Sequence, residues 1–545
     1  MPHLARAPRA QAALSALIGV GLCLAFLALR YHYRPPLGDG LDGAYYFQIA
    51  RQVALGHGLD TSYSVFHMAL APLPQRATTY PLLPLCIGYL GRIVPLSEAA
   101  VWLPGAAYVL SIGLCYGFLL WVTARSQPRS PWTHRVLLCA ALSAWFGLLP
   151  VYVWTSARPY TETLSNALVL GTLWCFGLGT TARFRAAWQR RAAFVAVGLL
   201  AGLCYLARFQ LIVVPIALLL ARMLARDRRA LRDSAWLTLG AAACLAWQAW
   251  RQLTLPNGQP YALIDFAMYR QRADVPPFVY DMQFGNRWAW FLDKLRGVLV
   301  SLDPNGIDSY LVQLSFLVLV VPLGVIVLLL RQIQRARGEG WRALGCAGLR
   351  RPRHAALLAS VWLGVLAVAP LHTVHSLRWR SWAFAWRQGM PLVYLVIPIV
   401  IWLLSFDKRA LRALVALLLG ASLVVCARKT EEVLDRRVPT GQLDAYADVA
   451  RYLDEHAPTN GTLGMEHQSL AVFTAQPLYW LACWSPPAFA QVLIRDLPID
   501  RIVLRPGELY CPSLDRIRSL LRAEQSFTAH FPFVLYRIER HSTSR

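Results

Sequence analysis

Two groups of polar residues are of types that could carry out chemistry, and the first is a pair of carboxylates near the N-terminus. Asp39 and Asp42 precede a segment in which Tyr46, Ile49 and Val53 share one helical face, which predicts an amphipathic helix along the membrane surface. Asp42 at the start of that helix fits two roles. It could cap the helix by accepting backbone N–H bonds, or it could act as a general base just outside the bilayer. Spacing alone leaves both roles open.

The second group is a basic loop late in the chain. Arg378, Arg380 and Arg387 lie there with His372 and His375, and the loop has no acidic residue. A guanidinium binds two oxygens of a phosphate at once, so this loop predicts an anion at the membrane surface. Attraction to lipid headgroups, or a different threading of the chain, would also account for these charges.

The elements that must position these residues are membrane spans. The chain has 545 residues, 57% of them hydrophobic and 15% charged, with a formal net charge of +25. This composition excludes a soluble globular enzyme, a disordered chain and a disulfide-stapled secreted module, and it predicts an α-helical polytopic membrane protein. Apolar stretches long enough to cross a bilayer predict about eleven transmembrane helices, at 11–29, 99–121, 136–154, 162–180, 192–207, 209–224, 235–250, 309–330, 355–374, 389–405 and 410–427.

The positive charges orient this bundle. With the N-terminus in the cytoplasm, the short inner loops hold many of the Arg and Lys residues, among them Arg190 and Arg222. Much of the charge excess is therefore a topology signal, and no nucleic-acid partner is predicted. The first span predicts an uncleaved signal anchor rather than a cleaved signal peptide. Arg208 falls at an outer span end, where it either binds an anion or extends its charge to the surface.

The chain divides into two predicted domains. Residues 1–427 form a transmembrane domain with outer loops at 30–98, 251–308 and 372–388, and residues 428–545 form a small extracytoplasmic α/β domain. In this tail, patterns predict helices at 446–458 and 513–524 and strands at 462–467, 501–506 and 533–540. Cys483 and Cys511 could form a disulfide there in an oxidising compartment.

Several short motifs resemble the GT-C superfamily of glycosyltransferases, which includes protein O-mannosyltransferases and aminoarabinose transferases. The stretch DGAYYFQIARQVALGHGL, followed by TTYPLLPLCIGYLGRIV, matches the family's first outer loop, with Asp42 and Tyr46 in its acidic and aromatic positions. Arg208 is similar to an Arg in the family's turn between paired spans. Arg387, in RQGMP, resembles the start of a late span.

The resemblance implies a function for each motif. Asp42 would be the catalytic base, and Arg387 would contact the phosphate of a polyprenyl-phosphate sugar, together with Arg378, Arg380 or Arg208. The sugar would pass with inversion to an acceptor hydroxyl on a glycan, a lipid or a protein, outside the cytoplasm. Some members have a second carboxylate where this chain has Gly43, and the aminoarabinose transferases have Glu-Lys where this chain has Thr79-Tyr80. Asp39 or Arg76 could substitute for these residues. The sequence has no cluster of Cys and His residues that would predict a metal site. Whether the protein uses a divalent cation as a cofactor is left open.

Two other classes of protein fit the composition. A polytopic transporter would have a similar number of spans, although it would usually carry charges or helix breaks at corresponding positions of two halves. A non-catalytic cell-envelope assembly protein would also fit, and it would need neither Asp42 nor the basic loop. The preference for Arg over Lys indicates a GC-rich bacterial genome, which makes the inner membrane the expected location.

Overall fold

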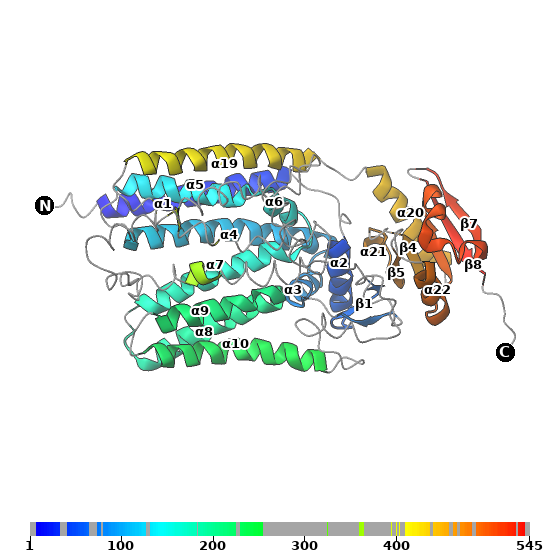
Figure 1. Cartoon of the computed structure of the whole chain (residues 1–545), viewed down its shortest axis with the longest axis horizontal. Coiled ribbons are helices and arrows are strands. Elements are labelled where there is room, and N and C mark those ends of the chain that lie inside the picture. The colour runs from blue at the N-terminus through cyan, green and yellow to red at the C-terminus, as the bar shows by residue number, and fades with distance from the viewer. Residues whose placement is uncertain are drawn as a thin grey trace, which may run out of the picture.

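The structure is a computed structural model in which a long helical bundle carries a small mixed domain at one end (Figure 1). It describes residues 7–32, 41–64, 73–77, 80–126, 131–182, 184–224, 229–253, 409–435, 440–456, 461–465, 469–481, 487–529 and 532–539, with isolated short stretches between 324 and 403. Most of the predicted spans 309–330, 355–374 and 389–405, the whole loop 372–388 and most of the loop 251–308 lie outside the described residues.

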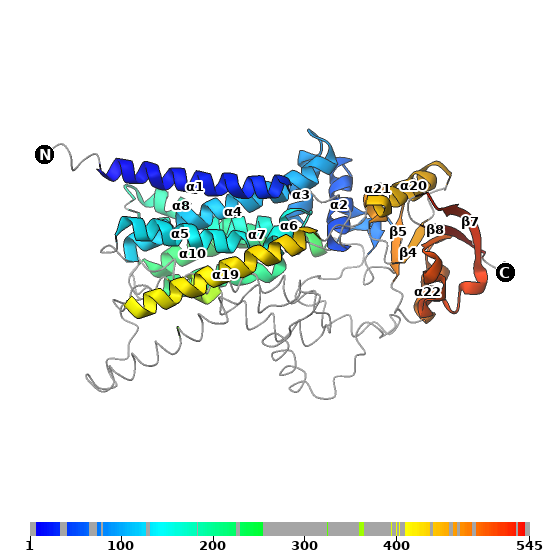
Figure 2. The same cartoon turned by 90° about the horizontal axis from the view of Figure 1, so that it is seen from above.

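Helices that run along one common direction form the bundle (Figures 1 and 2). They are α1 (Ala7–His32), α4 (Leu96–Ser126), α5 (Trp132–Gly147), α7 (Thr161–Thr181), α8 (Ala187–Ala207), α9 (Val213–Leu224), α10 (Ala230–Leu253) and α19 (Arg409–Asp435). Within the described residues, α1, α4, α7, α8 and α19 are long and apolar enough to cross a membrane, and a bent pair of helices would make a sixth span. The chain is thus a polytopic helical membrane protein, whereas the predicted number of eleven spans stays a prediction.

The predicted span 136–154 is broken in the structure. Helix α5 ends at Gly147, and α6 (Pro150–Ser156) continues at an angle of 64° to it. Pro150 begins α6, a position that proline favours because its missing N–H needs no partner there. A regular helix could not run through this proline without losing a backbone bond, so the second piece sets off in a new direction.

The predicted span 209–224 is also irregular. A 3₁₀ turn, η1 (Phe209–Ile212), precedes α9, whose 12 residues are fewer than a straight span requires. The chain therefore turns sharply between α8 and α9, directly after Arg208.

The loop between α1 and α4 builds a layer across one end of the bundle. It contains α2 (Leu41–Ala54), α3 (Leu82–Leu90) and a two-stranded antiparallel pair, β1 (Asp60–Thr61) with β3 (Gln75–Arg76). Figure 1 shows α2 running across the direction of the bundle helices. A helix is therefore present after Asp42, with Asp42 in its first turn. Residues 43–50 are all buried, so it is not the amphipathic surface helix that the pattern predicted.

The tail folds around a six-stranded sheet with the order β2-β5-β4-β6-β8-β7. Its elements in chain order are α20 (Thr440–His456), β4 (Thr462–Met465), α21 (Leu470–Phe473), β5 (Leu478–Leu481), α22 (Pro487–Asp496), β6 (Arg501–Leu504), η8 (Pro506–Tyr510), η9 (Pro512–Leu514), η10 (Arg518–Leu520), β7 (Leu521–Phe527) and β8 (Phe533–Ile538). Strand β2 (Tyr63–Ser64) comes from the loop before α4 and pairs in parallel with β5, Tyr63 opposite Leu478. The tail and the first loop thus share one sheet.

The helix predicted at 513–524 is wrong. The chain forms short 3₁₀ turns there and then enters β7, which pairs antiparallel with β8, Leu521 opposite Ile538. Cross-strand pairing stabilises β7 in a segment whose local sequence favours a helix, so the tertiary context overrides the propensity. Helix α20 confirms the helix predicted at 446–458. Strands β4, β6 and β8 confirm the three predicted strands.

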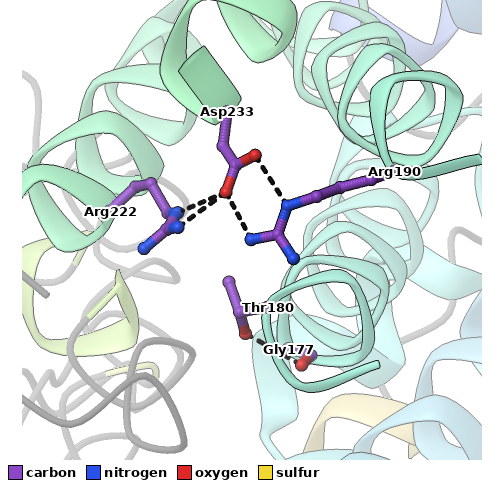
Figure 3. A network of polar contacts seen from close by, with 5 residues as sticks. All are labelled: Gly177, Thr180, Arg190, Arg222 and Asp233. Carbon is purple, nitrogen blue, oxygen red and sulfur yellow. Dashed lines mark hydrogen bonds and ion pairs between the residues drawn. The ribbon is translucent and has the colours of Figure 1, made fainter. Parts of the chain in front are cut away.

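A buried ion cluster ties three bundle helices together (Figure 3). Arg190 of α8 donates from Nε to Asp233 Oδ1 at 2.9 Å and from Nη2 to Oδ2 at 2.6 Å, and Arg222 of α9 donates from Nη2 to Oδ2 at 2.6 Å. The side chains of Asp233 and Arg222 are each 1% exposed. Both arginines were predicted only as topology signals, yet here they join α8 and α9 to α10.

Asp233→Ala should destabilise the bundle by about 3–5 kcal/mol, because it leaves two guanidinium groups buried without their carboxylate. Denaturant unfolding in detergent measures the loss. Asp515→Ala is the matched control, because Asp515 pairs with Arg518 at the surface of the tail and such pairs contribute about 1 kcal/mol or less. An equal loss in both variants would contradict a structural role for the buried cluster.

Candidate functional site

The N-terminus of α2 places Asp42 against the connection between α6 and α7. Asp42 is partly exposed, and Gly43 beside it is buried. A Cβ on Gly43 would lie 3.6 Å from the rings of both Pro159 and Tyr160. These are ordinary van der Waals distances, so α2 packs against the connection at this position. The carboxylate stands at the junction of the first loop and the bundle.

Tyr63 on β2 provides a buried hydroxyl close to Asp42. Its side chain is fully buried, and its ring packs edge-on against Tyr45 at a centroid distance of 6.4 Å. Burial raises the pKa of Tyr63 well above its ordinary value, and the negative charge of Asp42 raises that pKa further. The hydroxyl therefore stays protonated. Within the described part of the chain it has no hydrogen-bond partner.

Arg208 lies in a buried ion pair in the turn after α8. Its Nη1 donates to Glu162 Oε1 at 2.8 Å, and its Nε donates to Gln210 Oε1 at 3.1 Å. The residue is 8% exposed, so its charge is held inside the protein. Glu162 lies in the first turn of α7, where a carboxylate also interacts favourably with the positive end of the helix dipole.

A line of aromatic rings connects α2 with this turn. Tyr46, which is 3% exposed, lies 6.4 Å from Tyr80 between ring centroids. Tyr80 in turn packs edge-on against Phe209 at 4.8 Å, and Phe209 lies 5.3 Å from Tyr205. The site residues Asp42, Tyr46 and Arg208 are thus brought to the same end of the bundle, through the α6–α7 connection and through these rings.

Glu162 is the residue of this site that sequence reasoning missed. It is 1% exposed at the start of a span, in the sequence Pro159-Tyr160-Thr161-Glu162-Thr163. An acidic residue within a span is expensive to bury and is therefore a functional candidate by default. That rule, applied to span 162–180, would have identified Glu162 from the sequence.

Hydroxyl groups gather around Glu162. Thr161, Thr163 and Ser165 are buried, and within the described residues their side-chain oxygens have no hydrogen-bond partner. Elsewhere in the bundle such hydroxyls bond to a preceding carbonyl, as Thr172 does to Leu168 O at 2.7 Å. The first turns of α7 therefore offer hydroxyls that a polar ligand could bind.

The tail docks directly on the helix that carries Asp42. Gln48 of α2 donates from Nε2 to Thr474 O at 2.7 Å and also to Ala471 O. Arg51 donates to Thr474 O and Val472 O. These carbonyls lie at the C-terminal end of α21, where a helix leaves backbone oxygens without internal donors. Two side chains of α2 satisfy them, so α2 joins the bundle to the tail.

Four of the predicted site residues lie outside the described residues. They are Asp39, Arg378, Arg380 and Arg387. The approach of Asp42 and Arg387 to one cavity therefore stays a prediction. In the tail, Cys511 is disulfide-bonded, while its predicted partner Cys483 also lies outside the described residues.

The described residues do not assemble a metal centre. No group of three or more His, Cys, Asp and Glu side chains that could hold a metal ion occurs among them. Glu162, the buried carboxylate of this site, already accepts a bond from Arg208 at 2.8 Å. Among the described residues, therefore, no set of ligands for a divalent cation is assembled.

Comparison with solved structures identifies the fold. The chain is similar to an oligosaccharyltransferase of Archaeoglobus fulgidus, crystallised with Zn and sulfate, with a TM-score of 0.57 and 14% identity over 96% of this chain and 73% of that one. The apo form gives a TM-score of 0.54, with 12% identity over 97% and 75% of the two chains. A complex of that enzyme with an inhibitory peptide and a dolichol-phosphate gives 0.51, with 11% identity over 96% and 74%.

The chain therefore shares the overall fold of this oligosaccharyltransferase over most of its length. At such low identity the likeness shows the fold alone. No family model matches the chain, and no curated protein matches it.

Tyr63→Phe should leave stability unchanged or raise it by about 1 kcal/mol, because a buried hydroxyl without a partner costs free energy in the folded state. Tyr479→Phe is the matched control on the neighbouring strand β5. The Tyr479 hydroxyl accepts a bond from the Leu73 N–H at 3.1 Å, so its removal should lower stability by about 1 kcal/mol. Thermal unfolding of both variants gives the comparison, and equal losses would show that the Tyr63 hydroxyl is engaged.

Proposed function

We propose that this protein is a membrane glycosyltransferase that moves a sugar from a polyprenyl-phosphate donor to an acceptor hydroxyl. The observation that carries the proposal is the placement of Asp42. Its helix α2 lies across the end of a bundle with the fold of an oligosaccharyltransferase, against the connection that leads to the Glu162–Arg208 pair. One structure of that enzyme contains a dolichol-phosphate, which is a polyprenyl phosphate, so a donor of this class is in keeping with the fold.

Asp42 acts as the general base in this proposal. The acceptor hydroxyl gives its proton to the carboxylate while its oxygen attacks the anomeric carbon of the sugar. The bond from that carbon to the phosphate oxygen breaks, and the lipid phosphate leaves with the electron pair. A single displacement of this kind inverts the configuration at the anomeric carbon.

Arginine side chains stabilise the phosphate as negative charge grows on its oxygens. Arg387 is the main candidate, with Arg378 and Arg380 from the same loop as further contacts. Arg208 uses one N–H for Glu162 and one for Gln210, and a guanidinium has five. Its remaining donors can therefore serve the phosphate. Fixed charges at a boundary of low dielectric stabilise such a transition state strongly.

The remaining parts of the site serve the substrates in this proposal. Tyr46 positions α2 through the aromatic line to Tyr80, and Asp39 stands before the same helix. A glycan, a lipid or a protein supplies the acceptor hydroxyl. The oligosaccharyltransferase of this fold was crystallised with Zn, so a divalent cation is compatible with this proposal, and no step is assigned to one.

The proposed location is the bacterial inner membrane, with the N-terminus in the cytoplasm and the tail outside. The first loop and the tail share a sheet, and α2 bonds to α21, so both lie at one end of the bundle. The short loops at the other end carry Arg residues, in agreement with the positive-inside rule.

Asp42→Asn should lower transfer by roughly 10²–10⁴-fold, because the amide cannot accept the proton of the acceptor hydroxyl. The assay uses purified protein in vesicles with radiolabelled polyprenyl-phosphate sugars, and a membrane extract supplies the acceptor. Asp444→Asn in the tail is the control for the loss of one carboxylate. Near-normal transfer by Asp42→Asn would identify another base, and no transfer by the unaltered protein would favour a transporter or an assembly protein.

Arg387→Ala should raise the donor concentration needed for half-maximal rate by roughly 10–100-fold, the range expected for loss of a hydrogen bond to a charged group. The same vesicle assay, run over a series of donor concentrations, measures this change. Arg516→Ala at the surface of the tail serves as the comparison. An unchanged donor dependence in Arg387→Ala would remove this residue from the site.

A further inference from the structure

The proposed chemistry leaves unused a groove between α1 and α4. It encloses about 530 Å³, within the range of pockets that bind small molecules. Aliphatic, aromatic and glycine residues of both helices form most of its wall. Trp102 and Leu110 on its α4 side are exposed, so the groove opens on the outer surface of the bundle, which faces lipid.

The groove runs from the membrane interface toward the bilayer interior. At one end lie Arg30, Tyr31 and Trp102, residue types that favour the boundary between headgroups and hydrocarbon. At the other end lie Cys23 and Gly113. On α4 the lining extends from Val101 to Leu114, which corresponds to roughly 20 Å along the helix. This depth suits an extended hydrocarbon chain that lies parallel to the helices.

Small residues line the groove where α1 and α4 lie close together. Ala106 and Gly113 line its α4 wall, and a Cβ on Gly113 would come within 3.1 Å of Cys23 Sγ. Gly105 gives room to the guanidinium of Arg30, because a Cβ there would lie 3.3 Å from Arg30 Nε. Larger side chains at these positions would fill the space between the two helices.

Arg30 is the only charged residue among the described residues that line the groove. It is 6% exposed, and it donates from Nε to Ser156 O at 2.9 Å and from Nη2 to Val101 O at 3.3 Å. These bonds hold a positive charge at the interfacial end. Ser156 ends α6, and Pro159 three residues later lies against Gly43, the neighbour of Asp42.

We propose that this groove binds the polyisoprenyl chain of the lipid-phosphate donor, with Arg30 beside the phosphate end of the chain. The proposal rests on the proposed function, and it adds the surface on which the lipid lies. An apolar chain packs along α1 and α4, and its anionic end is directed by Arg30 toward the connection that also positions Asp42. Bilayer lipids are as apolar as the groove, so close packing rather than transfer from water sets the preference for this chain.

A photoreactive polyprenyl phosphate with a diazirine in its isoprenoid chain tests the site directly. It is incorporated with the full-length protein into phosphatidylcholine vesicles, irradiated, and mapped by mass spectrometry. We expect labels on residues 23–31 and 101–114. An excess of unlabelled long-chain polyprenyl phosphate should abolish this labelling, whereas the same excess of phosphatidylglycerol should not change it. The proposal would be overturned if both lipids abolished the labelling equally, or if the labels were found only on other helices.

Ala106→Leu fills the groove without straining α4, because leucine is a good helix former. It should lower both the labelling and the preference of transfer for a long-chain over a short-chain donor by roughly five- to tenfold, as lost packing contacts accumulate. Gly21→Leu on α1 is the matched control, because a Cβ there would meet no atom within 4 Å. Equal effects of the two variants would contradict the assignment.

The two proposals fail separately in these experiments. Labelling of the groove without any transfer by the unaltered protein would overturn the glycosyltransferase function and leave a lipid-phosphate site. If Ala106→Leu transferred sugar with a normal preference for long-chain donors, the groove would not be the lipid site, and the glycosyltransferase function would still hold.

Discussion

The helix that carries Asp42 is held from both sides, and the rest of this end of the molecule depends on that constraint. On one side Gly43 lies against Pro159 and Tyr160 at the start of α7. On the other side Gln48 and Arg51 satisfy carbonyls at the end of α21 in the tail. A buried backbone carbonyl without a donor raises the free energy of the folded state. Moving α2 away from the tail would leave these carbonyls in that condition, so α2 stays in place. A catalytic carboxylate on such a helix has a fixed position relative to the bundle.

Buried charge organises the bundle at both ends. At one end Asp233 joins Arg190 and Arg222, and at the other end Glu162 pairs with Arg208. Replacing one member of such a pair leaves a charge in a region of low dielectric, which makes each pair sensitive to substitution. Only the second pair lies near Asp42, where it leaves guanidinium donors and neighbouring hydroxyls for a polar ligand. The first pair serves the packing of α8, α9 and α10.

The tail is part of the same structural unit as the first loop. Strand β2 completes one edge of its sheet, and a common core contains Tyr45 and Ile49 from α2 together with Tyr446 and Val449 from α20. An acceptor that approaches the site would therefore meet surfaces from both parts. The groove proposed for the lipid lies between the spans α1 and α4, so a donor bound there would reach this end of the bundle from the bilayer.

The sequence by itself determined the membrane-helical class, the spans at α1, α4, α7, α8 and α19, and the helix after Asp42, because length, apolarity and period are local properties. The sequence also singled out Arg208 as a candidate site residue, because a charged residue at the end of an apolar span is unusual. Only the tertiary structure decided the strand β7, the partner of Arg208 and the sheet that β2 shares with the tail. These features depend on contacts between residues far apart in the chain, and no local pattern encodes which partner a buried charge or an edge strand will find.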